Sequence, residues 1–346
     1  MQGLVFEGPG VIRHATDLAD PDIEGPGDAI VQVLAAGLCG SDLHPYLGRE
    51  PARAGVVAGH EVVGRVVAVG AGVRAVAEGD RVIVPFTLSC GSCDPCRRAL
   101  SSRCDRSRLL GWGDPDPSGP VLHGGQAQYV RVPMAEGSLV AIGGGISALE
   151  GLLLSDNLPT GWYAALRGGV TEGSRVAVIG LGAVGLCAVA SCLALGAAEV
   201  LAIDPVAQRR EGAAALGAVV AEPDLEGDGL VDVAIDAAGP DAAQRLAARL
   251  VRPGGSVSLI AVQTAGAFAI DPVTAYDRNL TITAGRAPVR SLLDDLLPRI
   301  AQGSVTIPVD AVITHPGQPL AEGPALYRRF ADRADGLVKA VFAPNA

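Results

Sequence analysis

The chain has 346 residues, of which 49% are hydrophobic and 18% charged, a composition typical of a globular protein rather than a disordered or coiled-coil one. Its formal net charge of −10 and pI near 5.0 argue against nucleic acid or an anionic membrane surface as a partner. The N-terminus lacks a basic start followed by an apolar run, and no uncharged apolar segment reaches the roughly 20 residues needed to span a bilayer. We therefore expect a cytoplasmic protein.

The first 150 residues contain short β-branched runs separated by Gly and Pro. Examples are residues 29–34, 61–69 and 81–85. Runs of this length and composition, bounded by turn residues, are typical of strands. The pattern predicts a compact, mostly β unit.

From about residue 155 the pattern changes to strands that alternate with Ala-rich helical segments. Strands are expected at 175–179, 199–204, 231–236, 255–260 and 280–284, with helices from about Ala183 and over 206–216. This alternation predicts an α/β fold with a doubly wound parallel sheet. The mixed pattern returns after about Arg286 and ends in a strand-like run at 337–342. We expect a discontinuous first domain, 1–153 with 287–346 returning to it, and a second domain at 154–286.

A glycine motif, Gly180-Leu-Gly182-Ala-Val-Gly185, lies between the first predicted strand of the second domain and the following helix. In this context the motif indicates a dinucleotide site, in which the helix N-terminus faces the pyrophosphate. Asp204 ends the next predicted strand, where a carboxylate accepts the ribose hydroxyls of NAD and repels a 2′-phosphate. NADP is the less favoured alternative, with Arg209 or Arg210 as phosphate ligands.

Four cysteines, Cys90, Cys93, Cys96 and Cys104, lie within one short segment. Four thiolates bind zinc tetrahedrally and leave no open position, so this pattern predicts a structural zinc site. An iron–sulfur cluster and a nucleic-acid-binding zinc ribbon are the alternatives. The ribbon normally uses two separated pairs of cysteines and a basic surface, and nothing else in the chain requires an electron carrier.

Three further residues complete a recognisable order of motifs. Cys39 lies in Gly37-Leu-Cys-Gly-Ser-Asp-Leu-His44, His60 in Gly59-His-Glu61, and Asp156 four residues before Thr160-Gly161. Together with the four-cysteine segment and the glycine motif, this order resembles the zinc-containing medium-chain alcohol dehydrogenases over essentially the whole chain. The resemblance implies a GroES-like catalytic domain joined to a Rossmann domain.

The family resemblance assigns a role to each motif residue. It implies two zinc ions per chain, a structural one on the four cysteines and a catalytic one on Cys39, His60 and Asp156, with Glu61 as the alternative to Asp156. Many members have Cys at the third position, and Asp is similar to the secondary-alcohol and formaldehyde-dismutating branches. The remaining roles are a proton relay, a second carboxylate near the zinc, contacts to nicotinamide and pyrophosphate, and a substrate channel. The matching residues are Ser41 and His44, Glu61, Thr160 and Lys339, and Phe86, Leu109 and Trp112.

The resemblance therefore implies an enzyme that interconverts an alcohol and an aldehyde or ketone with NAD. A zinc-bearing reductase of an activated C=C or iminium bond is the alternative, and a non-enzymatic protein with the same fold is a third reading. The intact donor and relay set argues against both. The expected partner is a small-molecule alcohol or carbonyl compound, and the expected assembly is a homodimer or homotetramer.

Overall fold

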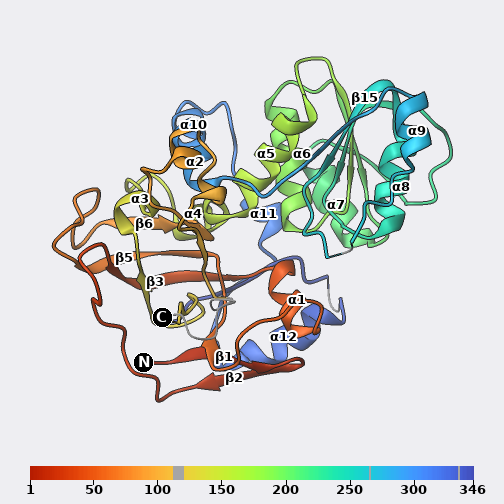
Figure 1. Cartoon of the computed structure of the whole chain (residues 1–346). Helices are drawn as coiled ribbons and strands as arrows, with labels where there is room; N and C mark the ends of the chain where they lie inside the picture. Colours follow the sequence, from red (N-terminus) through yellow and green to blue (C-terminus); the bar gives the residue numbers. More distant parts are fainter. Residues whose placement is uncertain (112–120, 265, 334–335) are drawn as a thin grey trace. The chain divides into compact units, whose positions relative to one another are not determined.

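The computed structural model describes residues 1–111, 121–264, 266–333 and 336–346 (Figure 1). Contacts between residues divide the chain into two compact units. The first unit comprises Met1–Asp156, Pro288–Asp295 and Ile313–Ala346, and the second comprises Asn157–Ala287 and Leu296–Val312. The expected division placed all of 287–346 in the first unit. The structure assigns Leu296–Val312 to the second because α11, Val309–Val312, packs on α6 and α7 of that unit.

A largely antiparallel seven-stranded sheet dominates the first unit. Its strand order is β10-β6-β5-β3-β18-β17, and β9 also pairs with β3. The bounds are β3 Ala29–Leu38, β5 Val62–Val69, β6 Arg81–Val84, β9 Tyr129–Val132, β10 Val140–Ala141, β17 His315–Gln318 and β18 Ala340–Phe342. The predicted mostly β unit is therefore present, and buried Val, Ala and Leu side chains of these strands form its core.

Smaller elements surround this sheet. A three-stranded sheet contains β2 (Val11–Ala15), β1 (Gly3–Gly8) and β4 (Val56–Val57), and a two-stranded one pairs β7 (Thr87–Leu88) with β8 (Arg108–Leu109). The helices of this unit are α1 Leu43–Tyr46, α2 Asp94–Arg97, α3 Ala135–Ser138, α4 Ala148–Ser155 and α12 Gly323–Ala331. Short 3₁₀ turns lie at Gly40–Asp42, Ser101–Arg103 and Leu320–Glu322. Helix α10, Val289–Ala301, contributes residues to both units.

The register of three strands determines where the motif residues of the first unit lie. The end of β3 pairs with the start of β5, Ala36 opposite Val62, and with the start of β18, Leu38 opposite Ala340. Antiparallel pairing brings the end of one strand beside the start of the next. The residues just after β3 and just before β5 and β18 therefore meet at one end of the sheet.

The second unit is a six-stranded parallel sheet with the order β13-β12-β11-β14-β15-β16. The strands are β11 Arg175–Ile179, β12 Glu199–Ile203, β13 Val219–Ala221, β14 Val231–Asp236, β15 Val251–Leu259 and β16 Thr281–Ala284. The strand order reverses between β11 and β14, the position at which open α/β sheets bind ligands. The predicted α/β fold with a doubly wound parallel sheet is confirmed.

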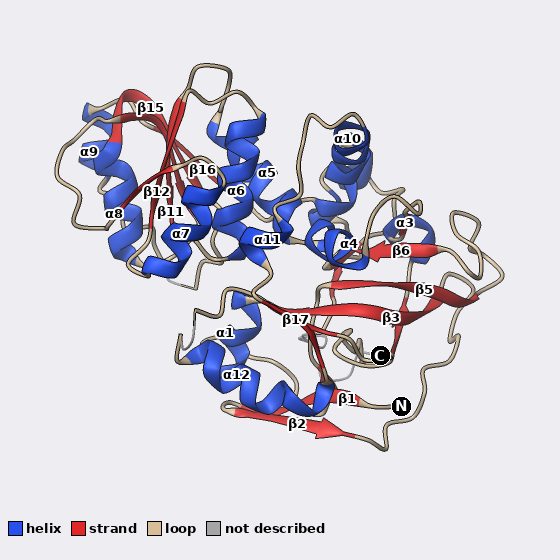
Figure 2. Cartoon of the chain, turned by 180° about the vertical axis from the view of Figure 1, so that it is seen from behind, coloured by secondary structure: helices blue, strands red, loops and turns tan. Residues whose placement is uncertain are grey.

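Helices cover both faces of this parallel sheet. Helices α5 and α6 lie on one face and α8 on the other (Figure 2). The bounds are α5 Asn157–Gly168, α6 Ala183–Ala194, α7 Ala207–Ala215, α8 Asp241–Leu250 and α9 Pro272–Asp277. Among the described residues, no helix combines the length and apolar character that crossing a membrane requires.

Candidate active site and metal centres

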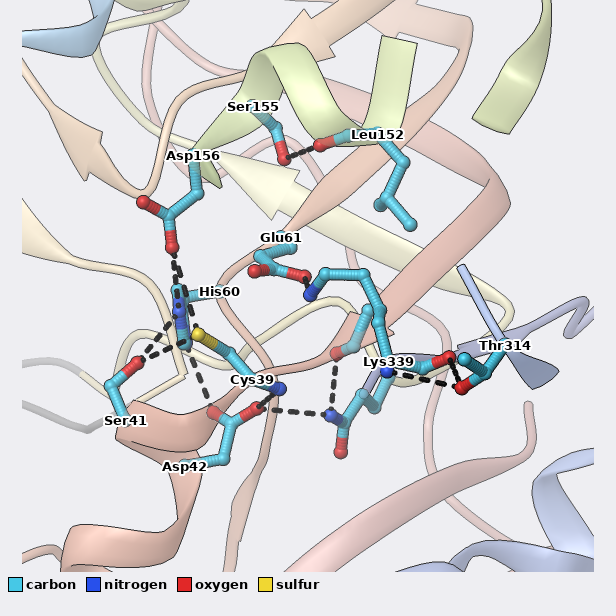
Figure 3. Close-up of polar contacts among 12 residues, drawn as sticks. Cys39, Ser41, Asp42, His60, Glu61, Leu152, Ser155, Asp156, Thr314 and Lys339 are labelled. Carbon is cyan, nitrogen blue, oxygen red and sulfur yellow. Dashed lines mark hydrogen bonds and ion pairs between the residues drawn. The ribbon is translucent and has the colours of Figure 1, made fainter. Parts of the chain in front are cut away.

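Four potential metal donors gather at the end of the large sheet of the first unit. They are Cys39, His60, Glu61 and Asp156, all buried, with donor atoms within 4.8 Å of one another. Asp156 Oδ2 lies 3.3 Å from His60 Nε2 and 3.8 Å from Cys39 Sγ (Figure 3). A zinc ion with ordinary bond lengths separates tetrahedral N and O donors by about 3.3 Å and S and O donors by about 3.5 Å. The donor types and spacings of Cys39, His60 and Asp156 therefore fit a zinc ion.

The local sequence places each donor. Cys39 directly follows β3, and His60 and Glu61 directly precede β5, so the strand register brings these three together. Asp156 lies in the break between α4 and α5, where its φ of −154° and ψ of −67° end the first helix. The buried leucines of α4 pack this helix onto the sheet, and its last residue leads directly into Asp156.

A buried carboxylate behind the metal donors was not anticipated from the sequence. Asp42 Oδ1 lies 3.0 Å from His60 Nδ1, and Asp42 Oδ2 accepts the Cys39 backbone N–H at 2.9 Å. A carboxylate on the far nitrogen of a metal-binding His fixes the ring orientation. The local sequence carried one signal for it. Asp42 lies three residues after Cys39, which caps the following helical turn, and this is the spacing of a capping box.

A longer chain of polar contacts continues from Asp42. The Gln126 amide donates to the Gly37 carbonyl at 2.9 Å and to Asp42 Oδ2 at 3.5 Å, and the Tyr327 hydroxyl donates to Gln126 Oε1 at 2.8 Å. Gln126 and Tyr327 are almost fully buried. A Cβ on Gly59 would lie 2.3 Å from Gln126 Cγ, so the glycine beside His60 makes room for this side chain.

Without a metal ion, the surroundings of His60 and Cys39 favour the protonated forms of both side chains. Burial acts to lower the pKa of His60, but the charge of Asp42 and hydrogen bonds to Asp156 and Asp42 raise it well above its ordinary value. Burial and the charge of Glu61 raise the pKa of the Cys39 thiol. Because thiolate and neutral imidazole are the metal-binding forms, a cation that binds here must displace protons.

Of the two residues expected to move protons, Ser41 lies beside this cluster. Ser41 Oγ is 3.2 Å from Cys39 Sγ and 3.1 Å from His60 Nε2. His44 lies on α1, and its buried Nδ1 atom has no hydrogen-bond partner in the part of the chain that the structure describes. Burial lowers the pKa of His44, so the ring is neutral at neutral pH. An unpartnered buried ring nitrogen fits a group that meets a ligand.

Glu61 makes a buried ion pair. Lys339 Nζ lies 2.5 Å from Glu61 Oε2, and both side chains are fully buried. Burial acts to lower the pKa of Lys339, but the negative charge of Glu61 raises it. The lysine expected near the pyrophosphate therefore directs its ammonium to Glu61.

The four cysteines of the second predicted metal site also lie together. Cys90, Cys93, Cys96 and Cys104 have sulfur atoms within 4.8 Å of one another. Burial acts to raise the pKa of Cys90, but donation from the Ser92 backbone and the Arg106 side chain lowers it to about 5. Burial and the neighbouring Cys93 raise the pKa of Cys96 to about 12. Four sulfurs at this spacing fit a closed tetrahedral site.

The glycine motif follows β11, the strand at which the strand order of the parallel sheet reverses. Gly180 has a φ of +89°, and a Cβ there would lie 2.8 Å from the Ala238 backbone. A Cβ on Gly185 would lie 1.8 Å from the Gly180 carbonyl oxygen, whereas a Cβ on Gly182 would meet no atom of the described residues within 4 Å. Gly180 and Gly185 therefore serve backbone geometry, and Gly182 leaves open space at the N-terminus of α6, which fits an approaching phosphate group.

Asp204 lies just after β12 and is almost fully buried. Its Oδ2 accepts the Leu181 backbone N–H and its Oδ1 accepts that of Val206, each at 2.8 Å. Arg209 Nη1 lies 3.6 Å from Oδ2, and Arg210 donates to the Asp204 carbonyl. The Asp204 carboxylate therefore also fixes the glycine loop, a function that the sequence did not indicate.

The remaining expected residues are divided between the units. Thr160 is buried on α5 of the second unit. In the first unit, the Phe86 ring contacts His60 edge-to-face at 6.2 Å, and the Phe86 carbonyl accepts the backbone N–H of Leu110, the neighbour of Leu109. Trp112 lies outside the described residues.

Comparison with known proteins matches the chain to zinc-type alcohol dehydrogenases. Residues 25–142 match the model of the alcohol dehydrogenase GroES-like domain, and residues 183–301 match that of the zinc-binding dehydrogenases. The chain is 40% identical to "Probable zinc-binding alcohol dehydrogenase Rv1895" of Mycobacterium tuberculosis over 337 residues, 95% of this chain and 85% of the relative. Among solved structures, alcohol dehydrogenase TADH from Thermus sp. ATN1 superposes with a TM-score of 0.90, 35% identity and 99% coverage of both chains. A zinc-binding dehydrogenase homologue from Sinorhizobium meliloti, bound to NADP, superposes with a TM-score of 0.83 and 28% identity over 99% of both chains.

Proposed function

Because the chain belongs to the zinc-type medium-chain alcohol dehydrogenases, we propose that it interconverts an alcohol and an aldehyde or ketone by hydride transfer to or from NAD. The observation that carries this proposal is the buried trio Cys39, His60 and Asp156 at tetrahedral spacing, with the Ser41 hydroxyl beside it. Three protein donors leave a fourth position of a zinc ion open, as in catalytic rather than structural sites.

The chain's own residues hold the metals in this proposal. Cys39, His60 and Asp156 bind the catalytic zinc, and Asp42 keeps the His60 ring oriented. When bound, zinc polarises the substrate oxygen and lowers the pKa of an alcohol. Cys90, Cys93, Cys96 and Cys104 bind a second, structural zinc that stabilises the fold.

Proton movement is assigned to Ser41 and His44. The Ser41 hydroxyl lies against two of the donors and accepts the alcohol proton as it donates its own onward. His44, neutral and with a buried unpartnered nitrogen, is the acceptor that passes the proton toward solvent. Phe86, whose ring contacts His60, and Leu109 provide apolar surface beside this path.

The cofactor is assigned to the second unit. Gly182 at the start of α6 would hold the pyrophosphate, Asp204 would accept the ribose hydroxyls, and Thr160 would contact the nicotinamide, which would carry the hydride. NAD is favoured over NADP because a carboxylate at Asp204 repels a 2′-phosphate. This preference is supported by the burial of Asp204 against the glycine loop, which restrains the side chain from turning away.

The test is initial-rate kinetics of NADH formation with primary, secondary and polyol alcohols, with the chelator-treated and zinc-restored protein as paired controls. We expect activity that disappears on loss of the catalytic zinc and returns on its addition. Activity on an activated C=C bond without any alcohol oxidation would replace the proposal with the reductase reading.

A further inference from the structure

Lys339 is the only lysine of the chain, and it is buried. The chain contains 27 Lys and Arg residues, and Lys339 is the only lysine among them. Its side chain is fully buried, and its Nζ atom lies 2.5 Å from Glu61 Oε2 (Figure 3). Lysine offers a compact point charge, whereas arginine offers a wide planar fork, so the two are not interchangeable in a confined site. The one lysine of the chain thus provides a compact, buried counter-charge to the Glu61 carboxylate.

The backbone on both sides of the ion pair is fixed. Thr314 Oγ1 accepts the Lys339 backbone N–H at 3.3 Å, and the Lys339 carbonyl accepts the backbone N–H groups of Thr314 and His315 at 3.1 Å. On the other side, the Glu61 carbonyl accepts the Gly37 backbone N–H at 3.1 Å. A Cβ on Gly37 would lie 1.8 Å from Glu61 Oε2, so only glycine leaves room for the carboxylate in this position.

Glu61 therefore faces two possible cations. Its carboxylate is one of the four grouped metal donors, and it is also the partner of Lys339. Ionised Cys39 and Asp156 already match the charge of a divalent zinc ion, so Glu61 adds a further buried negative charge, as does Asp42 behind His60. Lys339 pairs with the Glu61 charge, and a buried charge left unpaired is strongly unfavourable.

We propose that Lys339 is a positioning residue that holds Glu61 off the catalytic zinc and thereby keeps the fourth coordination position open. The inference rests on the proposed function, in which Cys39, His60 and Asp156 are the three protein ligands. Without the lysine, the buried Glu61 carboxylate loses its counter-charge at 2.5 Å, and a metal ion held by the grouped donors would lie within its reach. A fourth protein ligand converts an open catalytic site into a closed one.

Zinc content tests this inference, with the four-cysteine site as the internal reference. The proteins to compare are the parent, Asp156→Ala, Lys339→Met and the double variant Asp156→Ala/Lys339→Met. We expect about two zinc ions per chain in the parent, about one after Asp156→Ala, and about two again in the double variant, because the released Glu61 replaces the missing ligand. If Asp156→Ala alone retains both metals, the proposed ligand set is wrong. If it loses one and the double variant does not recover it, the ligand set stands and the inference about Lys339 is overturned.

A second measurement reads the open position directly. In the protein with cobalt at the catalytic site, imidazole binding is followed through the visible absorption of the metal. We expect Lys339→Met to weaken imidazole binding at least tenfold, and Lys339→Met/Glu61→Gln to restore it to within about threefold of the parent. A purely structural ion pair predicts unchanged imidazole binding in correctly folded Lys339→Met, and that result would overturn the inference.

Discussion

Replacement of Asp42 by Asn tests whether the carboxylate behind His60 tunes the metal site. The change keeps the size of the side chain but removes its charge. Asp42 is almost fully buried, with one oxygen 3.0 Å from His60 Nδ1 and the other accepting the Cys39 backbone N–H at 2.9 Å. Loss of the carboxylate partner of a metal-binding histidine typically lowers metal affinity by 10–100-fold, or about 1.4–2.7 kcal/mol. We expect a loss in this range at the catalytic site and none at the four-cysteine site.

The pH dependence of zinc affinity provides the sharper test. A proton and zinc compete for His60, and the charge of Asp42 raises the pKa of that ring. In the parent, zinc affinity therefore falls as the pH drops below the raised pKa. In Asp42→Asn the pKa moves back toward its ordinary value, so competition begins at a lower pH. At high pH the variant should bind zinc more weakly than the parent. As the pH falls from the His60 pKa of the parent to the lower His60 pKa of the variant, the variant should lose less zinc affinity than the parent.

The assay is competition with a chromophoric chelator across a pH series. Asp228→Asn is the control, because that side chain is 74% exposed and belongs to the other unit. Affinity within twofold of the parent at high pH, or a pH curve that coincides with that of the parent, would refute this account of Asp42.

Three further predictions concern the other sites. Cys93→Ser should remove one zinc per chain and lower the unfolding temperature, measured by elemental analysis and calorimetry, while retention of both metals would contradict the four-thiolate site. Asp204→Ser should reduce the ratio of kcat/KM for NAD to that for NADP, and it should raise the KM for both cofactors because Leu181 and Val206 lose their acceptor. A parent enzyme that prefers NADP would refute the role of Asp204. Gly185→Ala should cost about 1–3 kcal/mol of stability because its Cβ meets the Gly180 carbonyl, whereas Gly182→Ala should leave stability unchanged and weaken cofactor binding. Equal stability losses in chemical denaturation would show that Gly182 also serves packing.

The Rossmann-type unit was largely predictable from the sequence because its signals are local. The strand Arg175–Ile179, the helix that begins at Ala183 and the strand Val231–Asp236 have the expected bounds. Apolar β-branched runs and Ala-rich segments specify these elements without information from distant residues. The start of β15 at Val251 was missed, since Pro253 and Gly254 interrupt its pattern.

The polar network around the donors was not predictable, because its members are far apart in the sequence. Gln126 is 84 residues from Asp42, and Tyr327 is 201 residues from Gln126. Nothing in the local sequence distinguishes Gln126 from an ordinary polar residue beside a strand. Only the folded chain shows that Gly59 makes room for its side chain.

The two metal sites differ in how they depend on the fold, and this difference explains what the sequence revealed about each. The four cysteines lie within one short segment, so their spacing alone indicated a site. The catalytic cluster and Lys339 depend on the pairing of β3 with β5 and β18. A slip of one residue in β18 would turn Lys339 to the opposite face of the sheet and leave Glu61 without its counter-charge. The same hydrogen-bonded register therefore sets both the positions of Cys39, His60 and Glu61 and the charge that balances them, which is why the partner of Lys339 became visible only in the structure.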